Sequence, residues 1–135
     1  MGGVMRVLRS TRPNVVCFQE VTQRACEVLQ RARTWYALGL RAATPLPPGC
    51  YYGALILAAL PVLYAGRAPF PSTSQGRDFV EARVLSPWGS EVSVSTLRIE
   101  STSGRDIGTA RADQLRLAVG WLQSEGQRIC AGGFN

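Results

Sequence analysis

Three short segments of this sequence join a strand-like apolar run to side chains that can take part in chemistry. Glu20 comes directly after the β-branched and aromatic run at residues 15–18. Residues 95–102 run from a strand-like stretch into a polar loop with hydroxyl groups and an arginine. Residues 131–135 join a strand end to a glycine pair and a carboxamide. Because loops at strand ends carry function on a rigid scaffold, these segments are the candidate sites.

Each segment has a functional and a structural interpretation. A glutamate at the end of a strand can bind a hard divalent cation through oxygen, but it can also be solvated or cap a helix. Arg98 and the neighbouring hydroxyl groups can bind phosphate, and the pair Gly132-Gly133 predicts a turn after a strand. No segment decides between its two interpretations alone.

The residue types exclude several mechanisms. The sequence contains no histidine, so an imidazole cannot act as general base, general acid or metal ligand. All 15 basic residues are arginine, against 9 acidic residues, which gives a net charge of +6. Selection for bidentate phosphate contacts and the codon usage of a GC-rich genome both explain this choice, and both stay open.

The cysteines and the apolar stretches indicate where the protein resides. Metal-type C-x-x-C spacing is absent, so we expect no zinc site and reduced thiols. The longest apolar stretch, residues 54–60, is far below the ~18 residues that a membrane span requires. The N-terminus lacks a basic region followed by an apolar run, so we expect a nuclear or cytoplasmic protein that is not secreted and has no membrane partner.

The apolar periodicity predicts the elements that must position these residues. A first helix ends before Pro13, and Thr22 is a candidate N-cap for a second helix. Two period-2 runs joined by Pro87-Trp88-Gly89-Ser90 predict a hairpin. The expected elements are a helix around 4–8, strands at 15–18, 51–59, 62–64, 79–86, 91–98 and 128–131, helices at 22–36 and 110–122, and irregular segments at 44–50, 69–74 and 100–108. This order predicts sheets covered by helices.

Taken together, the segments resemble the endonuclease/exonuclease/phosphatase superfamily of DNase I-like phosphodiesterases, and within it most closely the tyrosyl-DNA phosphodiesterase group. The stretch PNVVCFQEV is similar to that family's strand with a metal-binding glutamate. TLRIEST is similar to its "SHLEST" segment, and AGGFN stands where members carry "AGDxN". The resemblance is carried by residues 13–21, 52–57, 69–73, 96–102, 111–115 and 131–135.

The resemblance implies a fold and an activity. The fold would be α/β (α+β), a partial four-layer α/β/β/α sandwich of the DNase I-like type, with residues 1–135 as one partial domain. The activity would be hydrolysis of phosphodiester bonds with Mg²⁺ or Mn²⁺, in particular of a 5′-phosphotyrosyl bond at a DNA end. The 5′ end of DNA would then be the partner, in DNA end repair.

The resemblance also assigns residues and shows departures. Glu20 matches the metal ligand, Asn135 the active-site asparagine, and Ser101 the loop that contacts substrate. Arg98 replaces a histidine; it can bind phosphate, but a guanidinium with a pKa above ~12 cannot transfer protons. Gly133 replaces the aspartate that handles the attacking water. We therefore expect little or no hydrolysis; the alternative is a non-catalytic fragment that binds phosphate or nucleic acid through Arg98, Arg105 and Arg111.

Length adds a second expectation. Domains of this superfamily have ~200–250 residues, so 135 residues make about half of one. Segments equivalent to the family's "TWN" strand and terminal "SDH" motif are not found. A partial sandwich leaves a sheet face and strand edges uncovered, which favours self-association or marginal stability. The whole interpretation requires Glu20 and Asn135 to lie side by side near Arg98.

Overall fold

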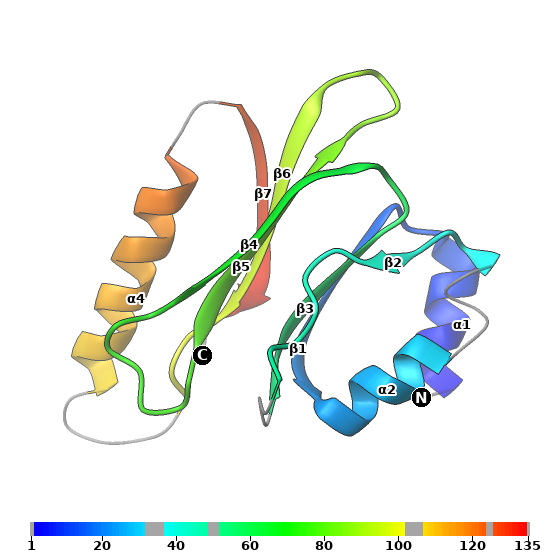
Figure 1. Ribbon diagram of the computed structural model, residues 1–135. Helices are drawn as coiled ribbons and strands as arrows, with labels where there is room; N and C mark the ends of the chain where they lie inside the picture. Colours follow the sequence, from blue (N-terminus) through cyan, green and yellow to red (C-terminus); the bar gives the residue numbers. More distant parts are fainter. Residues whose placement is uncertain (1, 32–36, 49–51, 102–106, 124–125, 135) are drawn as a thin grey trace.

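The protein is a sandwich of four layers (Figure 1). The computed structural model describes residues 2–31, 37–48, 52–101, 107–123 and 126–134. Helix α4 (Ile107–Leu122) covers the outer face of a four-stranded sheet, and helices α1 (Gly2–Thr11) and α2 (Gln23–Arg31) cover the outer face of a three-stranded sheet. The two sheets pack face to face between them. The expected α/β/β/α sandwich is confirmed.

The three-stranded sheet contains the first strand and its partners. Its order is β1-β3-β2, with β1 (Val15–Thr22), β2 (Arg41–Ala42) and β3 (Tyr52–Ala58). Both pairings are antiparallel. The edge of β1 opposite β3 is therefore open within this sheet.

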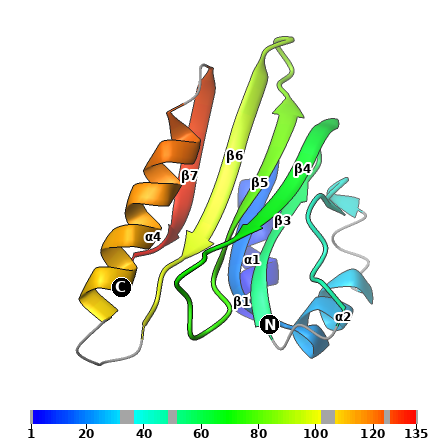
Figure 2. The ribbon, with the colours of Figure 1, turned by 60° about the vertical axis from the view of Figure 1, so that its left-hand side comes forward.

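The four-stranded sheet has the order β4-β5-β6-β7 (Figure 2). It consists of β4 (Val62–Pro69), β5 (Asp78–Leu85), β6 (Glu91–Arg98) and β7 (Gln127–Gly133). The first three strands are antiparallel, whereas β7 runs parallel to β6. A parallel neighbour requires a crossover, and α4 provides it.

Local signals in the sequence explain the helix ends. α1 ends at Thr11, where Arg12 takes a left-handed conformation (φ 44°) directly before Pro13. The Thr22 hydroxyl accepts a hydrogen bond from the Ala25 N–H at 3.1 Å, so the predicted N-cap of α2 is confirmed.

Successive side chains of β3 point to opposite faces of the sheet and so meet different layers. Leu55 and Leu57 pack against the helices, while Ala54, Ile56 and Ala58 face the other sheet. Because both faces are buried, the strand is an unbroken apolar run rather than an alternating one. The same alternation in β1 places Val16 and Phe18 toward the helices.

Two of the predicted boundaries are wrong. β1 does not end at Phe18 but continues through a bulge between Phe18 and Val21 to Thr22. β4 extends to Pro69 rather than to Tyr64, since a proline at the end of an edge strand removes no hydrogen bond inside the sheet.

The predicted turn at Gly132-Gly133 is also wrong, because both glycines lie inside β7. They pair with Leu97 and Arg98 of β6. A Cβ atom on Gly132 would lie 2.1 Å from the carbonyl oxygen of Leu97. Glycine is therefore required by the close approach of two backbones and not by a turn.

The buried carboxylate of Glu100 connects the loops at the end of the four-stranded sheet where β6 ends with Arg98. Glu100 is 1% exposed and accepts hydrogen bonds from the Thr73 hydroxyl (3.0 Å), the Ser74 N–H (2.9 Å) and the Ser74 hydroxyl. Gln114 of α4 donates to Glu100 and to the Ser72 carbonyl. Burial alone would raise the pKa of Glu100, but the hydrogen bonds from Ser74, Thr73 and Gln114 outweigh it, so the pKa lies below its ordinary value.

Part of the surface is apolar. A groove of about 620 Å³ is lined by apolar side chains from α1, β1, β5, β6 and β7, and it includes the exposed Trp88 and Ile129. Self-association through such a surface stays a prediction. None of the described helices is long and apolar enough to cross a membrane.

We expect Gly132→Ala to lower the free energy of unfolding by about 1–3 kcal/mol, because the added methyl group forces β7 away from β6. Chemical denaturation measures the change. Gly120→Ala on α4 is the matched control: its Cβ meets nothing within 4 Å, and alanine in a helix gains about 0.5–1 kcal/mol over glycine. Equal stability of Gly132→Ala and wild type would contradict the register of β7.

Glu100→Gln should lower the free energy of unfolding by about 1–3 kcal/mol, because an NH₂ group replaces one of the two carboxylate oxygens and faces the donors that this oxygen accepted from. Because the folded pKa of Glu100 is lowered, its contribution is present above the ordinary pKa of 4.5 and is lost as pH falls through the lower, folded value. Denaturation at pH 7 and pH 3 should show a difference between wild type and variant that shrinks in acid. As a control, Glu91→Gln removes a carboxylate from an exposed ion pair with Arg83 and should change the free energy of unfolding little at either pH.

Candidate active site

Glu20 lies in the bulge of β1, at the end of the sandwich where the two sheets meet Arg98. Its backbone is left-handed, with φ 55°, which is uncommon for a residue other than glycine. Bulges of this kind re-aim a side chain, and here the carboxylate reaches across to the other sheet. It forms an ion pair with the Arg98 guanidinium at the end of β6. The Glu20 side chain is 54% exposed and that of Arg98 21%.

The residue before Glu20 makes a second link between the sheets. The Gln19 amide nitrogen donates to the Thr96 hydroxyl at 2.7 Å, and Thr96 is fully buried in β6. Thus the QE pair of β1 is fixed twice to the strand that carries Arg98. This explains why a polar pair follows an apolar run in the sequence.

Gly133 lies beside Arg98 in the neighbouring strand. The two residues are partners in the parallel ladder, and the Ile99 N–H donates to the Gly133 carbonyl at 3.1 Å. A Cβ atom at position 133 would lie 3.4 Å from Arg98 Cγ. The structure therefore brings Glu20, Arg98 and Gly133 together.

A small hollow lies next to this group. Its lining includes Gln19, Glu20, Arg98 and several residues from the ends of β3 and β5, among them Tyr52, Arg77 and Asp78. The free space is about 10 Å³, which is about the room of one water molecule. The guanidinium of Arg98 thus leaves little space beside the Glu20 carboxylate.

Ser101 is held by a neighbouring loop. Its N–H and its hydroxyl both point to the Gln75 side-chain oxygen, at 3.0 and 3.1 Å. Arg77, 5% exposed, donates to the Ser101 hydroxyl at 3.0 Å and lies over the Tyr52 ring at 5.3 Å. Ser101 is therefore joined to the hollow through Arg77, and its role in substrate contact stays a prediction.

Asn135 lies outside the described residues. Its expected position beside Glu20 therefore stays a prediction. Gly133, two residues earlier in the same motif, is described, and it lies on the Arg98 side of the site.

A divalent cation does not fit the described residues at Glu20. The negative charge of the Glu20 carboxylate is already balanced by Arg98, and the free space beside it is about 10 Å³. Mg²⁺ requires six oxygen ligands in near-ideal octahedral geometry and usually keeps several waters. In the described ranges, no three His, Cys, Asp or Glu side chains gather into a possible ligand set.

Sequence reasoning missed Arg77 and the pair Arg67–Asp78. Arg67 of β4 forms an ion pair with Asp78 and donates to the Ala54 carbonyl at 2.7 Å, so it is a further polar link between the sheets. The signal was the charged pair Arg77-Asp78 directly before the period-2 run that starts at Phe79, but nothing in its spacing showed that these side chains turn inward.

Comparisons with known proteins place the fold. No family model matches the chain, and no curated protein matches it by sequence. Solved structures do match. TDP2 from D. rerio, complexed with a single-stranded DNA product, has a TM-score of 0.81 at 21% identity, covering 99% of this chain and 52% of that one.

Two further matches come from other organisms. TDP2 from C. elegans has a TM-score of 0.79 at 20% identity and covers 98% of this chain and 41% of that one. An endonuclease/exonuclease/phosphatase protein from Beutenbergia cavernae has a TM-score of 0.77 at 17% identity, with 98% and 41% coverage. The chain accordingly has the DNase I-like α/β fold of the endonuclease/exonuclease/phosphatase proteins, and it spans about half the length, or less, of the solved chains that it matches.

Proposed function

We propose that this protein is a phosphodiesterase-like member of the tyrosyl-DNA phosphodiesterase type that holds a nucleic-acid 5′ end but hydrolyses it barely or not at all. One observation carries the proposal: the Arg98 guanidinium is paired with Glu20 and lies beside Gly133. The carboxylate that would bind a metal ion therefore binds an arginine. The position that would hold a second carboxylate has no side chain.

The chemistry of these residues supports loss of turnover. A guanidinium can bind and orient a phosphate oxygen, but it cannot accept or donate a proton at neutral pH. With glycine at 133, the described carboxylates at the hollow are Glu20 and Asp78, and each is already paired with an arginine rather than placed to take a proton from an attacking water. Removal of a single preorganised group typically costs ~10²- to 10³-fold in rate. Two are changed here, so we place the protein among degenerate relatives of DNA end-repair enzymes rather than among the enzymes.

We do not propose that Glu20 binds the Mg²⁺ or Mn²⁺ ion expected from the family resemblance. Its carboxylate is neutralised from within the chain, and no catalytic step is assigned to a metal ion at this site. A DNA phosphate that reaches the site would instead meet the positive charges of Arg98 and Arg77.

The binding alternative has the same observation in its favour. Of its three arginines, Arg98 lies at the hollow, whereas Arg111 donates to the Glu100 carbonyl at 2.8 Å and so supports the loop instead. Arg105 is outside the described residues. Nucleic-acid binding without turnover therefore rests on Arg98, and Arg77 is the neighbour that could join it.

We expect purified protein with Mg²⁺ to release tyrosine from a 5′-phosphotyrosyl oligonucleotide at least about a hundredfold more slowly than D. rerio TDP2 does under the same conditions. Gly133→Asp should not restore activity, because the new carboxylate would lie against Arg98. Turnover at the rate of the fish enzyme would overturn the proposal.

Binding separates the two forms of the proposal. If the chain binds a 5′-phosphorylated single strand, fluorescence anisotropy in the presence of EDTA should show affinity that falls with salt by a log–log slope of about −0.7 per phosphate contact. Arg98→Gln should weaken binding and reduce the slope, whereas Arg116→Gln on the exposed side of α4 should not. No binding at low salt would leave the fold without a nucleic-acid function.

A further inference from the structure

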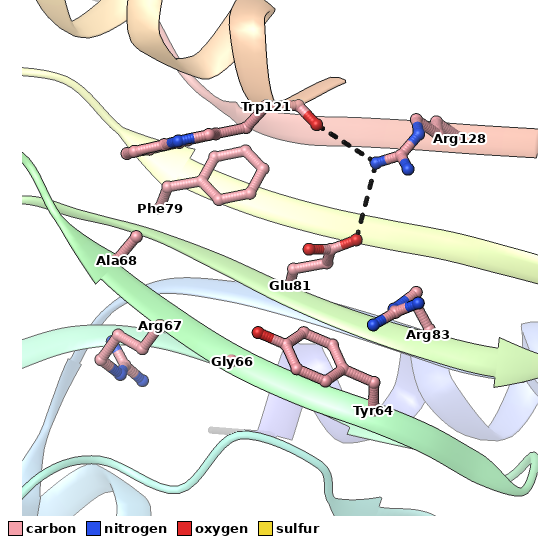
Figure 3. Close-up of a pocket in the computed structure, with 9 residues that line it drawn as sticks. All are labelled: Tyr64, Gly66, Arg67, Ala68, Phe79, Glu81, Arg83, Trp121 and Arg128. Carbon is pink, nitrogen blue, oxygen red and sulfur yellow. Dashed lines mark hydrogen bonds and ion pairs between the residues drawn. The ribbon is translucent and has the colours of Figure 1, made fainter. Parts of the chain in front are cut away.

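A second cavity lies on the outer face of the four-stranded sheet, away from Glu20. It has a volume of about 440 Å³, within the range of small-molecule sites, and opens between β4, β5 and α4 (Figure 3). In Figure 2 α4 lies alongside β7, and this end of the sheet carries no helix. The cavity is lined by Tyr64, Gly66, Arg67, Ala68, Phe79, Glu81, Arg83, Trp121 and Arg128.

Small residues on the edge strand create this cavity. The register places Gly66 opposite Glu81 and Ala68 opposite Phe79. A Cβ atom on Gly66 would lie 2.3 Å from the Tyr64 hydroxyl oxygen, so the Tyr64 ring lies over the bare backbone of β4. A larger residue at 66 would displace the ring and fill the floor.

Two polar groups in the cavity lack a protein partner in the described part of the chain. Ser93 and Arg128 both approach Oε1 of Glu81, Arg128 at 3.6 Å. The second carboxylate oxygen of Glu81 accepts no hydrogen bond from the described residues, and in Figure 3 it points toward the space beside Phe79. The Tyr64 hydroxyl likewise has none, and it points along β4 toward Gly66.

Aromatic rings form two walls. The Phe79 and Trp121 rings are 5.0 Å apart between centroids and tilted by 52°. On the other side, Arg83 lies over the Tyr64 ring with its guanidinium carbon 4.3 Å from the centroid. Walls made of aromatic rings and a guanidinium plane suit a flat aromatic ligand, which stacks on both kinds of group.

The charged residues that line the cavity favour an anionic ligand over a cationic one. Arg83 and Arg128 outnumber Glu81, while Arg67 turns to the opposite side of β4, where it pairs with Asp78. A cation would therefore be repelled, whereas a ligand with one negative group and a donor edge would match all three charged side chains. Arg83 is exposed enough to reach a phosphate, since its contact with Glu91 is a surface ion pair of 3.3 Å.

We propose that this cavity binds a guanine nucleotide, with the base between the aromatic walls, its donor edge on Glu81 and its phosphate near Arg83. A carboxylate only accepts hydrogen bonds. Guanine offers adjacent N–H donors on one edge, whereas adenine and cytosine present an acceptor next to their amino group. The nucleotide is either free or part of a single strand; the proposal does not rest on the function proposed for the Glu20 end.

Calorimetric titration of the whole chain with guanosine 5′-monophosphate, adenosine 5′-monophosphate, d(TGT) and d(TTT) tests the proposal. We expect guanosine 5′-monophosphate and d(TGT) to bind about tenfold more tightly than adenosine 5′-monophosphate and d(TTT), because both N–H donors of the guanine edge find an acceptor on Glu81. Tighter binding of d(TGT) than of the mononucleotide assigns the site to a strand, and equal binding assigns it to free nucleotide.

Three variants test whether binding takes place in this cavity. Tyr64→Ala, at a half-exposed position, should weaken guanine binding about tenfold through lost stacking, and Glu81→Gln should abolish the preference over adenine. Trp88→Ala removes the most exposed aromatic ring elsewhere and should change nothing. The proposal is overturned if no guanine ligand binds at millimolar concentration, or if Tyr64→Ala and Glu81→Gln bind as wild type does.

Discussion

The ion pair between Glu20 and Arg98 joins the two sheets at one end of the sandwich, and the properties of the candidate site follow from it. It cancels the charge of the carboxylate that, by family resemblance, is expected to bind a metal ion, and it fills the space beside that carboxylate. Since Glu20 is half exposed, the pair contributes little to stability, about 0–1 kcal/mol. Its significance lies in chemistry: a fixed guanidinium attracts phosphate but transfers no proton.

The neighbouring carboxylate, Glu100, is stabilised by hydrogen bonds rather than by an ion pair. It is buried, and among the described residues its carboxylate accepts hydrogen bonds from hydroxyl, amide and backbone donors rather than from a cation. Those donors come from the segment after β4 and from α4, so Glu100 fixes loops at the same end of the molecule as Arg98. The fold thus separates a carboxylate that holds structure from one that remains partly open to solvent.

Sequence patterns predicted the elements with strong local signals. The Thr22 cap, the stop before Pro13 and the unbroken apolar run of β3 each follow from a local rule and are confirmed. The bulge at Glu20 and the glycines of β7 were not predictable in this way. Both depend on how closely β1, β6 and β7 approach one another, and a single sequence does not contain that distance. The same holds for the ion pair: Arg98 was identified, but its partner across the sheets was not.

Manganese binding tests the central claim that the chain supplies its own cation at Glu20. In an electron paramagnetic resonance titration of the intact chain, the account predicts that wild type binds no stoichiometric Mn²⁺ at this site. Arg98→Gln should acquire a weak site, and adding Glu20→Gln should remove it again. Stoichiometric Mn²⁺ binding by wild type that disappears in Glu20→Gln would contradict the account.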